Sequence, residues 1–154
     1  MESDSFLTIL APSQGLFKDR KSRFVSLAFP VTTEEEIKEI VKKIKKEYYD
    51  AAHHCYAYVL GAKRTVFRSN DDGEPAAGAP ILGQINSKNL TNILVVVVRY
   101  FGGIKLGVPG LINAFRTATS NALDNAKVIT EFEKRKISVN FLYPNMNTVM
   151  GILK

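Results

Sequence analysis

The sequence predicts an α+β fold, a two-layer sandwich in which helices cover one face of a mixed β-sheet. Two observations predict it. Segments with helical periodicity alternate with strand-like apolar runs, and one run, Ile93 to Val98, is purely aliphatic, as in a central strand. The 154 residues suffice for one ordinary domain with a small appendage. We expect the main domain over residues 1–133 and the appendage over residues 134–154.

The first half of the chain predicts strands followed by a helix. Phe6–Ala11 and Arg23–Pro30 are apolar, and the intervening Pro12, Ser13 and Gly15 supply turn chemistry. Thr33–Tyr49 predicts a helix, because a threonine can cap it, three glutamates fill its first turn and its apolar residues share one face. We interpret the basic run near its end as a solvated face: Lys42, Lys43, Lys45 and Lys46.

The second half predicts a hairpin, a central strand and another helix. Ala51–Leu60 predicts a strand with Thr65–Arg68 as its hairpin partner, and a loop and a short helix over Pro80–Ser87 follow. Asn92–Phe101 predicts a strand apolar on both faces, and Val108–Ala126 a helix. We expect this helix and the earlier one to share one face of the sheet. The other face then needs a partner or the carboxy-terminal segment as cover.

The composition excludes several classes of protein. A net charge of +6 permits an anionic partner such as RNA without requiring one. Cys55 is the only cysteine, which excludes an internal disulfide and fits a reducing cytoplasm. No apolar run approaches the roughly 18 residues of a membrane helix, and the acidic start does not resemble a signal peptide. We therefore expect a cytoplasmic protein with no membrane contact.

Two clusters contain residue types that can bind a metal ion or act in acid/base catalysis. His53, His54 and Cys55 alternate between the faces of a predicted strand, so one metal cannot easily collect both histidines, and packed strand residues are favoured. The carboxylates of the DDGEP loop, residues 71–75, could hold Mg²⁺ or act as an acid/base pair. A turn in which aspartates bond nearby amides and Gly73 takes a positive φ is favoured instead. We expect no metal or cofactor.

The stretch from Arg99 to Gly110 is the most informative. A strand feeds the FGGIKLG loop, residues 101–107, which opens a helix, and such junctions can present amide groups to an anion. The loop matches neither the P-loop nor the GxGxxG pattern, and a purely structural junction is equally favoured. A second basic cluster lies near Phe17 and Phe24: Lys18, Arg20, Lys21 and Arg23. Such a cluster can bind RNA, but an edge strand protected by charge is slightly favoured. The candidate nucleic-acid or anion ligands are Arg99, Gly102, Gly103, Lys105, Gly107, Arg116, Lys21 and Arg23.

Six ordered strings resemble the YigZ/IMPACT family across nearly the whole chain. They are KSRF at 21–24, HHCYAY at 53–58, DDGEP at 71–75, PIL at 80–82, LTNILVVVVRYFGGIKLG at 90–107 and GLINAFRTA at 110–118. The segment between DDGEP and PIL is about two residues shorter than the family's. The positions that the resemblance singles out include His53, His54, Asp71, Asp72, Glu74 and Tyr100.

The resemblance implies a fold and a field of function. The family's first domain is similar to the second domain of a small-subunit ribosomal protein and to domain IV of elongation factor G. Its eukaryotic members are described as regulators of translation under stress, acting through protein partners, and nucleic-acid binding is proposed for bacterial ones. Family members usually continue into a ferredoxin-like domain, whose first strand and helix residues 134–154 resemble.

We therefore expect a binding module linked to translation, with RNA or a ribosome-associated protein as its partner. The alternatives are a small enzyme or phosphate-ester binder, using the DDGEP carboxylates and the FGGIKLG loop, and a purely protein-binding domain. In each case we expect DDGEP, HHC and FGGIKLG to lie together, because they fall at strand ends. The apolar stripe of Ile137, Val139, Phe141 and Tyr143 predicts docking on the first domain or a homodimer through the carboxy-terminal segment.

Overall fold

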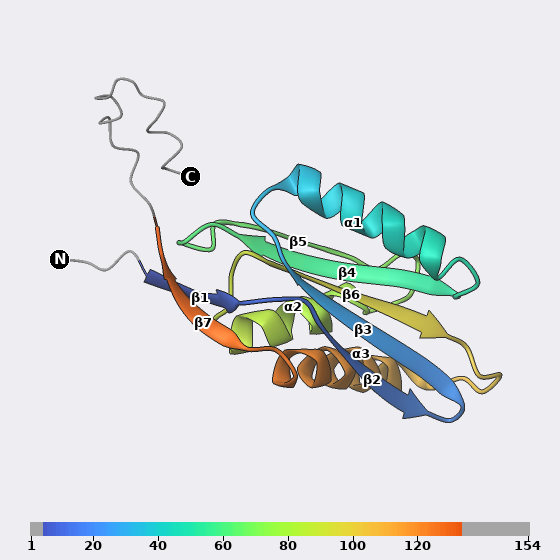
Figure 1. Cartoon of the computed structure of the whole chain (residues 1–154). Helices are drawn as coiled ribbons and strands as arrows, with labels where there is room; N and C mark the ends of the chain where they lie inside the picture. The colour runs from blue at the N-terminus through green and yellow to red at the C-terminus, as the bar shows by residue number, and fades with distance from the viewer. Residues whose placement is uncertain (1–4, 134–154) are drawn as a thin grey trace, which may run out of the picture.

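The computed structural model describes residues 5–133, in which a five-stranded antiparallel sheet lies between helices on both of its faces (Figure 1). The strand order is β2-β3-β6-β4-β5, and β1 pairs with β7 in a separate antiparallel ribbon. The elements are β1 (Ser5–Ile9), β2 (Ser13–Asp19), β3 (Ser22–Pro30), α1 (Glu34–Glu47), β4 (His53–Leu60), β5 (Val66–Asn70), α2 (Gly78–Ser87), β6 (Ile93–Tyr100), α3 (Gly107–Asp124) and β7 (Val128–Phe132).

Strand β6 is the centre of the sheet because its side chains are apolar on both faces. Ile93, Val95 and Val97 enter one core with α2 and α3, whereas Leu94 and Val96 enter a second core with α1. Each of these five side chains is fully buried. Strand β6 pairs along its length with β3 on one side and β4 on the other. A strand of this composition therefore requires cover on both faces.

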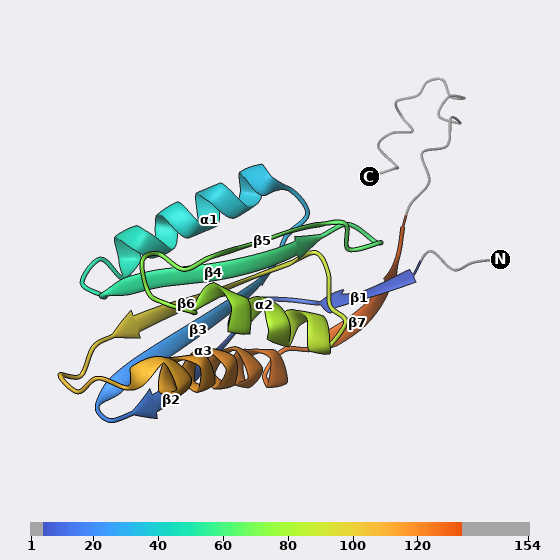
Figure 2. The same cartoon turned by 180° about the vertical axis from the view of Figure 1, so that it is seen from behind.

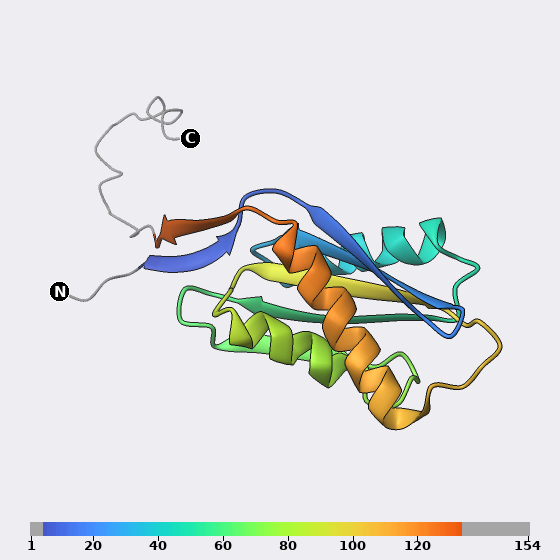
Figure 3. The same cartoon turned by 90° about the horizontal axis from the view of Figure 1, so that it is seen from below.

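The α+β class is confirmed, but the expected layering is wrong. Figures 2 and 3 show α2 and α3 together on one face of the sheet, with α1 on the other face. The expectation of a two-layer sandwich is wrong because the aliphatic side chains of β6 must be buried on both faces of the sheet. Helix α1 buries those on the second face. The expectation of a mixed sheet is also wrong, since every ladder of the five-stranded sheet is antiparallel.

Helix α1 forms where its amino-terminal signals predicted it. The Thr33 side chain accepts a hydrogen bond from the Glu36 amide at 3.2 Å, and the Glu36 carboxylate accepts one from the Thr32 amide at 2.9 Å. This reciprocal arrangement satisfies donors that a helix start leaves unpaired. Ile37 and Val41 then direct the apolar face of the helix onto the sheet. The local sequence thus fixes both the start of α1 and its orientation.

Two strands, β2 and β7, differ from what the sequence predicted. Ser13 and Gly15 lie within β2 and not in a turn. A Cβ atom at Gly15 would lie 2.5 Å from the backbone nitrogen of Ala122, so this glycine allows α3 to approach the strand. Strand β7 was not predicted; its side chains are mostly exposed, and pairing with β1 stabilises it where periodicity gives little signal.

The expectations for the carboxy-terminal segment concern residues outside the described range. These are the incomplete ferredoxin-like unit over residues 134–154, its apolar stripe and the homodimer through it. Within residues 5–133, no helix is both long and apolar enough to cross a bilayer.

A polar contact between Tyr58 and Glu34 joins α1 to the sheet. The Tyr58 hydroxyl, from β4, donates a hydrogen bond to the Glu34 carboxylate at 2.7 Å. Burial, followed by this hydrogen bond and the Glu34 charge, raises the pKa of Tyr58 to about 12 from its ordinary value of 10.0. The folded protein therefore gains stability from Tyr58 only while the hydroxyl is protonated.

This contact predicts a fall in stability at alkaline pH. The pKa of Tyr58 is higher in the folded than in the unfolded protein, so its contribution is complete below pH 10 and is lost as pH rises toward about 12. We expect the free energy of unfolding of wild type to fall toward that of Tyr58→Phe over this interval. Urea unfolding at several pH values measures the difference. Two curves that stay parallel across the interval would contradict the assignment.

Candidate functional site

The three motifs meet at the end of the sheet where β6 ends and β4 begins. Arg99, on β6, donates to the Glu74 carboxylate through Nη1 at 2.6 Å, and both side chains are buried. The His53 Nε2 atom lies 2.9 Å from the other oxygen of the same carboxylate. Glu74, Arg99 and Lys105 also line one hollow of about 350 Å³. The expectation that DDGEP, HHC and FGGIKLG lie together is confirmed.

The hydrogen bonds of His53 define where its protons sit. Its Nδ1 atom lies 2.9 Å from the carbonyl oxygen of Asp72, which can only accept, so Nδ1 carries a proton and donates. The Nε2 atom faces the Glu74 carboxylate at 2.9 Å, and this contact is an ion pair only when both ring nitrogens carry a proton. The Glu74 carboxylate thus lies between the Arg99 guanidinium and the His53 ring. Such a cluster compensates the cost of burying a carboxylate.

The aspartates of the DDGEP loop bond to the backbone, as the favoured interpretation predicted. The Asp71 carboxylate accepts from the Gly78 amide at 2.7 Å, at the start of α2, and the Asp72 carboxylate accepts from the His54 amide at 2.8 Å. Gly73 has a φ of 79°. His54 is itself buried, and its Nε2 donates to the Tyr48 carbonyl oxygen at 2.8 Å. The loop therefore ties β4 to α2.

Cys55 has the properties of a structural thiol. It is fully buried, and its Sγ atom donates to the carbonyl oxygen of Asp71 at 3.2 Å. Burial raises the pKa of the Cys55 thiol, and the charges of Asp72, Glu74 and Asp71 raise it further. The protonated thiol is a poor nucleophile. In the described part of the chain, no group of three His, Cys, Asp or Glu side chains is placed to hold a metal ion.

Arg99 is held between aromatic rings as well as by Glu74. Its guanidinium carbon lies 5.5 Å from the centre of the Phe24 ring and 5.3 Å from that of Phe101. Only 6% of Arg99 is exposed, and its Nε has no hydrogen-bond partner among residues 5–133. Arg99 thus anchors the start of the FGGIKLG loop, and the cations available to an external anion are its exposed neighbours.

The FGGIKLG loop lies directly against the β2–β3 hairpin. The hairpin turn consists of Arg20 and Lys21, both with positive φ, at 46° and 70°. A Cβ atom at Gly102 would lie 2.1 Å from the Lys21 carbonyl carbon, and the Gly102 amide donates to the Ser22 hydroxyl at 3.1 Å. Lys105 follows in the same loop. Gly102 is therefore required for two basic segments, distant in sequence, to touch.

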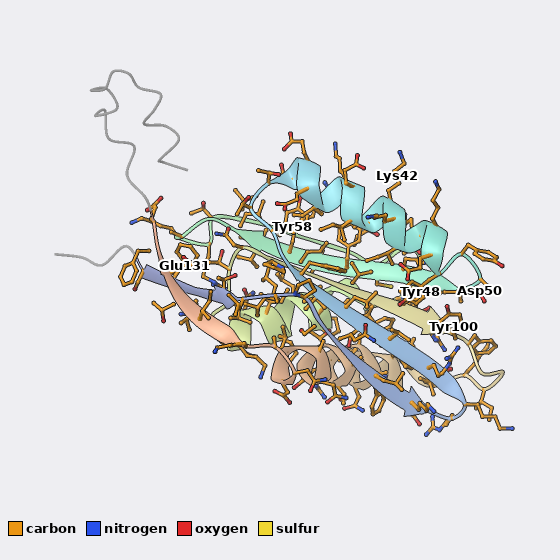
Figure 4. The ribbon with its side chains drawn as sticks, in the orientation of Figure 1. Lys42, Tyr48, Asp50, Tyr58, Tyr100 and Glu131 are labelled. Atoms are coloured by element: carbon orange, nitrogen blue, oxygen red, sulfur yellow. The ribbon has the colours of Figure 1, made fainter. Side chains whose placement is uncertain are left out.

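We call four exposed cations of these two segments the basic end: Arg20, Lys21, Arg23 and Lys105. The Arg23 guanidinium stacks 4.5 Å from the centre of the Tyr100 ring, whose hydroxyl donates to Asp50 at 3.2 Å. Tyr100 and Asp50 lie together at this end of the molecule in Figure 4. The ring therefore orients one cation of the basic end.

The remaining candidates have separate positions. Gly103 and Gly107 have positive φ, at 91° and 76°, and so shape the loop before α3. Arg116 is exposed and donates to Asn113 at 3.2 Å. It lies nine residues beyond Gly107, about 14 Å along α3, and does not belong to the basic end. Sequence reasoning missed Ser22, since a strand serine gives no signal of its contact with Gly102.

The fold and the motif cluster define a small α+β domain built around a buried ion pair. The Impact N-terminal domain family matches residues 20–123, and the chain belongs to this family, as its motifs predicted.

Three similar proteins illustrate the family. The chain is 40% identical over 127 residues to the IMPACT family member YvyE of Bacillus subtilis (strain 168), covering 81% of this chain and 58% of that protein. It is 39% identical over 124 residues to YigZ of Escherichia coli (strain K12), covering 78% of this chain and 61% of that protein. A crystal structure described as that of a hypothetical protein superposes with a TM-score of 0.81 at 34% identity, covering 86% of this chain and 66% of that one. The chain thus spans about three fifths of these two bacterial relatives.

The close approach at Gly102 gives a test of the site's architecture. Gly102→Ala places a methyl group against the Lys21 backbone, so we expect a loss of about 1–3 kcal/mol in the free energy of unfolding. Gly83→Ala is the matched control, because Gly83 lies within α2 with no atom in the way of a Cβ. The control should be stabilised by about 0.5–1 kcal/mol. Equal stabilities for the two variants, measured by urea unfolding, would refute the contact.

Proposed function

We propose that this chain is a cytoplasmic binding module linked to translation, and that it contacts RNA through the basic end. The observation that carries the proposal is the contact of Gly102 with Lys21. This contact brings the cations of the β2–β3 hairpin and of the FGGIKLG loop together at one end of the sheet. Arg20, Lys21 and Lys105 are all exposed there. Several exposed cations on one edge are the electrostatic requirement for phosphate contacts.

The link to translation rests on family membership. The eukaryotic proteins that the motifs resemble are described as regulators of translation under stress. The ribosomal-protein likeness expected for the fold points in the same direction. The chain spans only part of its bacterial relatives, so the partners of a whole protein belong to this proposal too. A ribosome-associated protein is the alternative partner, and salt dependence separates it from RNA.

The enzyme alternative has less support from the geometry. Asp71 and Asp72 each accept a backbone hydrogen bond, and Glu74 is paired with Arg99. Carboxylates occupied in this way are less available as acid, base or metal ligand than free ones. Cys55 stays protonated. The Glu74–Arg99 pair instead anchors the start of the FGGIKLG loop.

The proposal predicts a salt-dependent affinity for RNA that depends on the basic end. Lys21→Ala and Lys105→Ala should each weaken binding of a single-stranded RNA and reduce the slope of log K against log salt by about 0.7. Lys63→Ala is the control: it removes an equal charge from the exposed β4–β5 turn, at the opposite end of the sheet. Filter binding or fluorescence anisotropy across a salt series measures both quantities.

Two results would contradict the proposal. One is an equal loss of affinity in Lys63→Ala, which would show that net charge alone matters. The other is an affinity for RNA that does not change with salt, which would show that the cations of the basic end do not contact phosphates. All variants should keep the wild-type unfolding midpoint, because the three lysines are exposed.

A further inference from the structure

A second basic feature lies on the face of the sheet that carries α1. A groove of about 490 Å³ runs between this helix, strand β4 and the edge strand β5. It shares no residue with the basic end. The residues that matter here are three lysines of α1, two tyrosines of β4 and one arginine of β5: Lys38, Lys42, Lys45, Tyr56, Tyr58 and Arg68.

The lysines of α1 divide into two sets in the structure. Lys38, Lys42 and Lys45 follow the helical repeat directly beside the buried stripe, so they line the groove about one turn apart. Lys43 and Lys46 point elsewhere and do not line it. Figure 4 shows Lys42 extending from α1, with Tyr58 between the helix and the sheet. Lys42, Lys43, Lys45 and Lys46 are all exposed, as the solvated-face interpretation predicted, and Lys42 and Lys45 line the groove as well.

The opposite wall and the floor complete the groove. Arg68 is the register partner of Tyr58 across the β4–β5 ladder, so the two side chains leave the same face of the sheet. The rings of Tyr56 and Tyr58 lie 6.5 Å apart and nearly parallel, with an interplanar angle of 11°. Tyr58 is buried, whereas Tyr56 is only partly buried. Cations thus stand on both sides of a partly accessible aromatic ring.

We propose that this groove binds single-stranded nucleic acid, with phosphates at Lys42, Lys45 and Arg68 and a base against Tyr56. A cationic groove with an aromatic surface in its floor is the arrangement that single strands require, because every base can stack on a ring. Glu34 and Glu35 line the groove near the start of α1 and repel phosphate, so the site takes only a few nucleotides. The inference shares the class of ligand with the proposed function but uses different residues.

An acidic peptide is less well matched to the groove than a nucleic-acid strand. The carboxylates of an acidic peptide could pair with the lysines and Arg68, but they would leave the Tyr56 ring without a planar group to stack on it. A base flanked by phosphates uses both features at once. The acidic peptide is therefore an outcome to be tested.

The test compares two neighbouring lysines in the full chain. Binding of a short oligouridylate is measured for wild type, Lys42→Glu, Arg68→Gln and Tyr56→Leu, with Lys43→Glu as the matched control. Lys42 and Lys43 are adjacent, exposed and on one helix, but only Lys42 lines the groove. We expect about tenfold weaker binding for the three groove variants and less than about twofold for the control.

The possible outcomes distinguish the groove from the basic end. Equal weakening in Lys42→Glu and Lys43→Glu overturns the groove site. Loss of binding only in the Lys21→Ala, Lys105→Ala double variant overturns it too, but leaves the proposed function standing. Loss only in the groove variants supports the groove and overturns RNA contact at the basic end.

A competition experiment tests the class of ligand. If oligoglutamate competes as strongly as oligouridylate of equal charge, a nucleic-acid ligand is overturned. Because Lys42 and Arg68 are exposed, their variants keep the test valid if Tyr56→Leu does not fold.

Discussion

The buried ion pair between Arg99 and Glu74 is the interaction on which the site depends. Two opposite charges removed from water are tolerated only when each is satisfied, and loss of one leaves the other uncompensated. Arg99 is the penultimate residue of the central strand, and Glu74 belongs to the loop that leads into α2. Through His53 the pair also holds the start of β4. One contact therefore fixes three segments that are far apart in sequence.

The ion pair also separates buried from exposed charge. Arg99 is enclosed between the rings of Phe24 and Phe101, and the second ring begins the FGGIKLG loop. The loop continues to Gly102, which meets the β2–β3 hairpin at the Lys21 backbone. The hairpin turn is formed by two non-glycine residues with positive φ, a conformation that needs support from its surroundings. The buried Arg99–Glu74 pair thus fixes the loop and hairpin on which the cations of the basic end remain exposed.

Much of this arrangement could be predicted from the sequence, where local signals were strong. The cap at Thr33 and the apolar period of α1 gave the helix, and the aliphatic run gave β6. Strand ends gave the meeting of the three motifs, because such ends are neighbours in an antiparallel sheet. These predictions depend on covalent neighbours and on pattern.

Other features could not be predicted, because they depend on contacts with elements that are distant in sequence. A glycine in a strand gives no sign of whether it turns the chain or, as Gly15 does, admits a helix. Helical periodicity places Lys42 and Lys43 on different faces, but only the folded chain sets Tyr56 and Arg68 across from one of them. Strand β7 is likewise defined by pairing and not by its own residues. Tertiary contacts decided each case.

The most direct measurement of the central claim is a double-mutant cycle on the ion pair. The free energy of unfolding is compared for wild type, Arg99→Met, Glu74→Gln and the double variant. Each single change should cost about 3–5 kcal/mol, since it leaves a buried charge unpaired. The double variant should cost less than the sum of the two by at least about 1 kcal/mol. Additivity within about 0.5 kcal/mol would show that the two charges do not stabilise each other and would contradict this account.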